Sequence, residues 1–223
     1  SHNVMWEAQM RQGKMAKTKE SNVQKLVDAY STAAENEKFS FLCLQECVGE
    51  TIGKLQDKLP AGYAMLAGMY NTRKARSVIV YDAARFELVT DAVHTCFEDR
   101  KCTEQTGRPM AIAVFRDKRL LDRRVAVASV HAPHGNYSLR DNLVRLRRMA
   151  VNDEDEGTLS HIIVAGDFNR DDWQRPREIW NGPDAYWHQH EPKPKLLNAQ
   201  QWSLKAHNNY KATARFVVKS CTA

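Results

Sequence analysis

Acidic, imidazole and amide side chains stand at the ends of three apolar stretches in this sequence. They are Glu46, His131 with His134, and Asp167 with Asn169. Asp167 and Asn169 are two residues apart, so their side chains point to the same side of an extended backbone. A carboxylate beside a carboxamide can orient or deprotonate a water molecule, and an imidazole can donate a proton near neutral pH. A Gly-Asp turn at a strand end is the structural alternative for Asp167.

Each of the three stretches predicts a buried strand. Residues 39–46 and 161–166 are mostly apolar, and residues 124–134 alternate Val and Ala before they reach the histidines. Short apolar runs that stop at Gly or Pro are typical of strands in the interior of a sheet. We therefore expect the polar groups that follow these runs to converge at one rim of the sheet.

Five short motifs resemble those of the endonuclease/exonuclease/phosphatase family. They are Asn3-Val4-Met5-Trp6, Leu44-Gln45-Glu46, Gly107-Arg108-Pro109-Met110, His131-Ala132-Pro133-His134 and Gly166-Asp167-Phe168-Asn169. Their order and spacing fit the family over residues 3 to 169. The family includes deoxyribonucleases of the pancreatic type, apurinic-site endonucleases, tyrosyl-DNA phosphodiesterases, deadenylases, sphingomyelinases and inositol polyphosphate phosphatases.

The resemblance implies an α/β (α+β) fold, in which helices flank a two-sheet β-sandwich and the active site lies at one end of the sandwich. It implies a single domain over residues 1–223 and a phosphodiesterase that depends on Mg²⁺, with Mn²⁺ as the alternative ion. Glu46 and Asn3 are then metal ligands, because Mg²⁺ takes hard oxygen donors and keeps several waters. A Glu46 paired with a surface Lys and a turn-forming Asn3 are the structural alternatives.

The resemblance also assigns the catalytic residues. Asp167 orients or deprotonates the attacking water, and Asn169 supports it by hydrogen bonding. His131 matches either the catalytic His of pancreatic-type deoxyribonucleases or the Tyr of apurinic-site endonucleases. Both alignments make His131 a functional residue.

Three further residues are candidates for binding the substrate phosphate. His134 matches a phosphate-binding Asn in the alignment with apurinic-site endonucleases. Arg108 precedes Pro109 and is therefore held extended, and its planar guanidinium suits a phosphate. Arg73 is the third candidate, although a surface Arg without this role is the favoured interpretation.

The family's closing Asp-His pair is missing, because no Asp-His dipeptide occurs in the sequence. Two interpretations stay open: an active phosphodiesterase whose final strand or strands lie outside this sequence, and a degenerate member that binds phosphate-rich partners without cleaving them. The first is favoured, since the motifs at the three strand ends are all present. We therefore expect a gap beside the strand that ends at Asp167, either unfilled or filled by a partner chain, and no His from residues 170–223 near Asp167 and His131.

A net charge of +6 and an isoelectric point near 9.1 suit a protein that meets polyanions. Nucleic acid, DNA or RNA, is the expected partner, and an inositol phosphate or a phospholipid head group is the alternative.

Tryptophans interleave with Arg and Lys over residues 173–202, where they can stack unpaired bases or pack a long loop against the sandwich. No segment reaches the roughly 18 apolar residues of a membrane span.

The rest of the pattern predicts the elements around these motifs. Helices are expected from Ser21 or Asn22 to Ala34, from Ile52 to Leu59, and from Ser138 to Ala150. Further strands are expected over residues 63–69, 77–81, 86–93, 109–115 and 125–130.

Five cysteines, an odd number, favour reduced thiols and a cytosolic or nuclear setting, and a disulfide between Cys96 and Cys102 stays open. A zinc site is not expected, because no Cys-x-x-Cys pair occurs.

Overall fold

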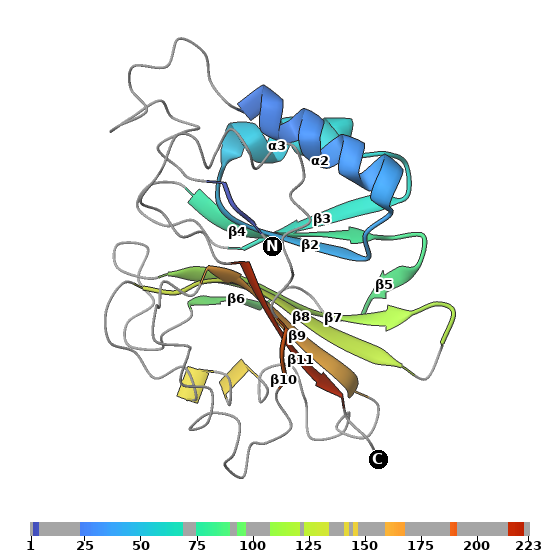
Figure 1. The fold of residues 1–223 in the computed structure, drawn as a ribbon, viewed down its shortest axis with the longest axis vertical. Coiled ribbons are helices and arrows are strands. Elements are labelled where there is room, and N and C mark those ends of the chain that lie inside the picture. The colour runs from blue at the N-terminus through green and yellow to red at the C-terminus, as the bar shows by residue number, and fades with distance from the viewer. Residues whose placement is uncertain are drawn as a thin grey trace.

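The apolar stretches form strands of two stacked β-sheets in the computed structural model (Figure 1). The structure describes residues 2–4, 23–68, 75–89, 93–96, 108–120, 123–133, 141–142, 145–146, 159–167, 188–190 and 214–220. The smaller sheet has the strand order β1-β2-β4-β3. Its strands are β1 (His2–Asn3), β2 (Phe41–Val48), β3 (Tyr63–Ala67) and β4 (Ala75–Asp82). β1 is parallel to β2, and the other neighbours are antiparallel.

The larger sheet has the strand order β10-β11-β9-β8-β7-β5, and β6 also pairs with β7. Its strands are β5 (Phe86–Leu88), β6 (Val93–Cys96), β7 (Pro109–Asp117), β8 (Arg124–His131), β9 (Leu159–Asp167), β10 (His188–His190) and β11 (Ala214–Ser220). β8 and β9 are parallel, whereas the other pairs are antiparallel. The two-sheet sandwich expected from the sequence is confirmed.

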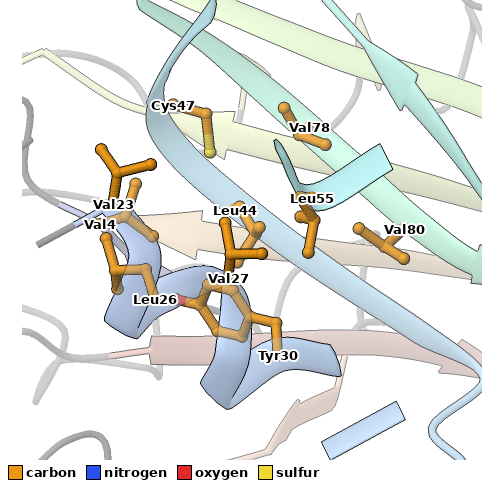
Figure 2. Packing of buried hydrophobic residues seen from close by; sticks show 10 residues of the cluster. All are labelled: Val4, Val23, Leu26, Val27, Tyr30, Leu44, Cys47, Leu55, Val78 and Val80. Carbon is orange, nitrogen blue, oxygen red and sulfur yellow. The ribbon is translucent and has the colours of Figure 1, made fainter. Parts of the chain in front are cut away.

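Two helices cover the outer face of the smaller sheet (Figure 1). They are α2 (Val23–Glu37) and α3 (Gly49–Lys58). The apolar positions that recur at helical spacing in α2 are its buried residues, as the sequence predicts. Figure 2 shows how they pack with Leu55 of α3 and with side chains of the sheet: Val23, Leu26, Val27 and Tyr30 meet Leu55 and Leu44, Cys47, Val78 and Val80. No helix within the described ranges is long and apolar enough to cross a bilayer.

A second apolar layer fills the space between the two sheets. Its buried members come from both sheets: Cys43, Ile79, Tyr81, Phe86, Ala111, Ala113, Phe115, Val127 and Ala165. The ring of Phe115 lies 5.1 Å from that of Phe41 and 4.8 Å from that of Tyr81, measured between ring centroids. Alternate residues of β2, β8 and β9 therefore face the opposite sheet, which fixes the register of each strand.

Strand direction brings the polar strand ends to one end of the sandwich. β2, β8 and β9 all finish there, at Val48, His131 and Asp167. β7 begins at the same end, immediately after Arg108, because it is antiparallel to β8. The site expected from the sequence thus gathers residues that lie more than a hundred positions apart in the chain.

Two expectations about strands are wrong. The position beside the strand ending at Asp167 is not a gap: β11 occupies it in antiparallel register, with Ala214 opposite Asp167. β10, which holds His188 and His190, lies beyond β11. The single strand expected over residues 86–93 is instead β5 and β6, because the register against β7 shifts: Leu88 pairs with Phe115, and Val93 with Ile112.

At the end of the sandwich far from the polar strand ends, a partly buried ion pair joins the β4–β5 turn to β7. The Arg85 guanidinium donates two hydrogen bonds to Asp117 Oδ2, at 3.0 and 2.7 Å, and the backbone N–H of Arg119 donates to Oδ1. The hydrogen bonds from Arg85 lower the pKa of the Asp117 carboxyl below its ordinary 3.8. The ionised carboxylate is therefore the form that stabilises this end of the fold.

We expect Asp117→Asn to lower the free energy of unfolding at pH 7 by about 1–3 kcal/mol, the scale of a hydrogen bond to a charged group. Because the pKa of Asp117 is lower in the folded state, its stabilisation is present above the unfolded value and is lost as the pH falls through the folded value. The difference between the variant and the wild type should therefore shrink at acid pH. Urea unfolding at pH 7 and pH 3 measures it. Asp28→Asn, in a half-exposed pair with Lys58, is the control and should have a much smaller effect at either pH.

Candidate active site

The structure brings Glu46, His131 and Arg108 together at the polar end of the sandwich. His131 Nε2 lies 3.7 Å from Glu46 Oε1 and 3.4 Å from the Arg108 guanidinium. Glu46 comes from the smaller sheet, and the other two come from the larger sheet. The side chains of His131 and Glu46 are only 4% and 14% exposed. An acid, an imidazole and a guanidinium thus share a site that is largely shielded from water.

A β-bulge in β2 turns Glu46 toward the other sheet. Regular alternation would place Glu46 on the face of Leu44, which packs against the helices. Instead β2 has one extra residue between Leu44 and Cys47, and Glu46 has a φ of 62°. A left-handed backbone at a residue other than glycine costs roughly 1–3 kcal/mol. The strain thus lies at a residue whose carboxylate comes within 3.7 Å of His131 Nε2.

The two contacts of His131 Nε2 call for opposite states of that nitrogen. A guanidinium can only donate, so the contact with Arg108 is favourable when Nε2 carries no proton. The contact with Glu46 is favourable when Nε2 is protonated. Adding a proton to Nε2 favours the contact with Glu46, and removing it favours the contact with Arg108. This arrangement suits a group that gives or takes a proton during a reaction.

Asp167 lies beside His131 because β8 and β9 are parallel and in register. His131 is the register partner of Asp167, and the backbone N–H of Ala132 donates to the Asp167 carbonyl at 2.8 Å. Asp167 shares the face of Ile163 and Ala165, which look toward the smaller sheet. Strand geometry therefore presents Asp167 on the same face as His131.

Two buried polar side chains link the sheets directly behind this site. Gln45 Nε2 donates to Ser129 Oγ at 3.0 Å, and Ser129 Oγ donates to the Leu44 carbonyl at 3.0 Å. Gln45 and Ser129 are both fully buried. Sequence reasoning missed Ser129, whose only signal is a hydroxyl within the apolar run of β8.

The two cysteines on either side of this bulge are buried free thiols. Burial raises the pKa of Cys43 to about 11. Burial, together with the negative charge of Glu46, raises the pKa of Cys47 further. Both thiols are therefore protonated at neutral pH and serve as apolar packing rather than as nucleophiles or metal ligands.

The carboxylate of Glu46 is a hard oxygen donor of the kind that Mg²⁺ takes. No group of three His, Cys, Asp or Glu side chains that could hold a metal occurs among the residues described. Structural zinc sites need four such protein ligands, whereas Mg²⁺ keeps most of its waters and needs only one or two carboxylates. Asn3, the other expected ligand, is the parallel register partner of Gln45 and so lies in the strand next to Glu46.

The remaining predicted site residues are outside the described part of the chain. These are Asn169, His134 and Arg73. Of the predicted site, the structure places Glu46 and Arg108 each close to His131 Nε2, and puts Asp167 and Asn3 on the neighbouring strands.

The sequence matches one protein family over most of its length. A model of the Endonuclease/Exonuclease/phosphatase family matches residues 13–214. No curated protein sequence gives a match to this chain.

Solved structures of several proteins share the fold, including these three. A mannosyl-6-phosphatase from Bacteroides thetaiotaomicron is 14% identical with a TM-score of 0.62, and the match covers 88% of this chain and 77% of that one. The human Nocturnin catalytic domain with a bound sulfate anion is 14% identical with a TM-score of 0.60, covering 98% and 80%. D. rerio TDP2 complexed with a single strand DNA product is 14% identical with a TM-score of 0.57, covering 90% and 79%. At these identities the likeness shows the fold alone.

Gly166 allows β8 and β9 to approach closely beside the site, so we expect Gly166→Ala to be strongly destabilising. A Cβ at this position would overlap the backbone oxygen of Val130, which cannot rotate away. The expected loss is about 3 kcal/mol or more, at or above the upper end for overpacked cores. Urea unfolding measures it. Gly53→Ala is the matched control: an added Cβ there meets nothing within 4 Å and should stabilise α3 by about 0.5–1 kcal/mol.

Proposed function

Because the chain belongs to the endonuclease/exonuclease/phosphatase family, whose members are phosphoric ester hydrolases, we propose that it hydrolyses phosphodiester bonds in nucleic acid with the aid of Mg²⁺. The observation that carries the proposal is the convergence of Glu46, His131 and Arg108 at the sheet end where β9 delivers Asp167. A phosphodiester resists attack because its oxygens are negative and its leaving alkoxide is poor. A carboxylate, a base and cationic donors are the groups that overcome this resistance.

In this proposal Glu46 holds the Mg²⁺ ion, with Asn3 as its second ligand and Mn²⁺ as the alternative metal. The bound ion supplies positive charge that neutralises the phosphoryl oxygens. The strained bulge supports the assignment of Glu46, since it turns the carboxylate from the helix face toward the site. The low exposure of Glu46 strengthens its attraction for a cation, because less water screens the charge.

The chain's own side chains would then carry the proton transfers. Asp167, supported by Asn169, orients or deprotonates the attacking water. His131 holds the phosphate or protonates the leaving oxygen, a role supported by its two competing neighbours.

Arg108 grips the phosphoryl oxygens through its guanidinium, which lies beside His131 Nε2. His134 and Arg73 are assigned to the same phosphate through the family resemblance.

Nucleic acid is the favoured substrate because of charge. A net charge of +6 concentrates polyanions around the protein and speeds encounter. A fold neighbour complexed with a single strand DNA product is compatible with this choice. A small phosphoester, such as an inositol phosphate or a lipid head group, is the second candidate substrate. It is supported by a mannosyl-6-phosphatase that has the same fold. Binding of phosphate-rich partners without cleavage is the third.

We expect Asp167→Asn and Glu46→Gln each to lower kcat at least about 10²-fold, since they remove a positioned base and a metal ligand without changing side-chain size. The assay is Mg²⁺-dependent cleavage of a labelled single-stranded oligonucleotide. Glu87→Gln, which removes an exposed carboxylate at the far end of the sandwich, should keep the wild-type rate. Excess EDTA should abolish cleavage, and undiminished turnover in EDTA would rule out the metal-dependent mechanism.

Salt dependence should separate a nucleic acid from a small phosphoester. An oligonucleotide bound through several phosphates releases counterions, so its log Kd should rise steeply with log salt, by about 0.7 per phosphate contacted for a single strand. An inositol phosphate should show a much shallower slope. Fluorescence anisotropy in EDTA at 50 and 200 mM NaCl measures binding without cleavage. A lack of oligonucleotide binding at 50 mM NaCl would move the proposal to the small phosphoester.

A further inference from the structure

Ser129 and Gln45 form the polar link between the two sheets nearest to the site. Ser129 is two residues before His131 in β8, and Gln45 immediately precedes Glu46 in β2. The Ser129 hydroxyl accepts a hydrogen bond from Gln45 Nε2 and donates one to the Leu44 carbonyl, both at 3.0 Å. The link therefore joins the strand that ends in His131 to the strand that carries Glu46.

The surroundings make this link unusual for a purely stabilising contact. The layer between the sheets is built mostly from apolar side chains, including Val127, which is two residues before Ser129 on the same face. Burying polar groups costs free energy, and their hydrogen bonds recover most of that cost rather than exceeding it. Hydrogen bonds are directional, however, so this pair fixes how the two strands lie along each other, which apolar contacts do only loosely.

The link also anchors the β-bulge at the point where it starts. Leu44 is the last residue in regular register with β4, and its carbonyl is the acceptor of the Ser129 hydroxyl. The next side chain, Gln45, is bound to the same hydroxyl, and Glu46 follows in the left-handed conformation. A strained backbone persists only where its surroundings determine it strongly. Ser129 supplies such a constraint from the opposite sheet.

We propose that Ser129 and Gln45 are positioning residues, which hold Glu46 and His131 in the relative placement that the reaction needs. The inference rests on the proposed function of this site. Neither residue touches the reacting atoms in this view; Ser129 acts through β8 on His131 and through the bulge on Glu46. A displacement of about 1 Å between reacting groups can cost about 10²-fold in rate.

The test compares two substitutions of nearly equal size. Ser129→Thr keeps the hydroxyl, whereas Ser129→Val replaces it with a methyl group and breaks both hydrogen bonds. We expect Ser129→Val to lower kcat on a labelled oligonucleotide by about 10- to 100-fold with KM nearly unchanged, the scale for losing a group that supports a metal ligand. Ser129→Thr should retain most of the rate. Mn²⁺ affinity, measured by EPR without substrate, should fall in parallel for Ser129→Val alone.

Two further variants separate positioning from stability. Val127→Ala creates a cavity in the same layer of the same strand, and should lower Tm while kcat and Mn²⁺ affinity stay at wild-type values. The double variant Gln45→Leu/Ser129→Val removes both polar partners, so no amide is left buried without Ser129, and Tm should recover relative to Ser129→Val. Its kcat should stay low. All rates are measured well below the lowest Tm of the series.

The outcomes are distinguishable. The positioning role is overturned, and the proposed function kept, if Ser129→Val loses no more rate than Val127→Ala, or if the double variant regains rate together with Tm. If the wild type neither cleaves the oligonucleotide nor binds Mn²⁺, the proposed function fails and this inference fails with it.

Discussion

Parallel pairing of β8 with β9 is the constraint on which the arrangement of the site depends. Parallel strands finish at the same edge of a sheet, so His131 and Asp167 become neighbours without any direct sequence proximity. Gly166 makes the pairing possible at its last step, because only a residue without Cβ tolerates the approach of the Val130 backbone oxygen. The smaller sheet then has to deliver only one carboxylate to this edge, and β2 does so through Glu46.

Much of this architecture could be predicted from the sequence because it follows from patterns with a direct physical cause. Helical spacing of apolar residues identified α2 and its buried face, since burial of one stripe is what holds a surface helix in place. Apolar runs that end in polar groups identified β2, β8 and β9 and the end at which they meet. The short motifs at these ends indicated the family, which the match over residues 13–214 confirms.

Other features depend on contacts that a linear pattern does not encode. The bulge at Glu46 shifts the register by one residue, and alternation along β2 would have placed this side chain against the helices. The Ser129 link joins residues 84 and 85 positions apart, so neither partner predicts the other. The prediction of a gap beside β9 was wrong for a related reason. β11 pairs with β9 through backbone hydrogen bonds, and these bonds place few demands on side-chain type, so the sequence pattern did not reveal the pairing.

The left-handed backbone at Glu46 determines which residue types are most stable at this position. Its φ of 62° favours Gly, and to a lesser degree Asn, over every other residue on conformational grounds. If folding stability were the only requirement, Gly or Asn at this position would therefore give a more stable protein than Glu. A glutamate at this position is the less stable choice. The carboxylate at this position is therefore held at a cost in backbone conformational energy.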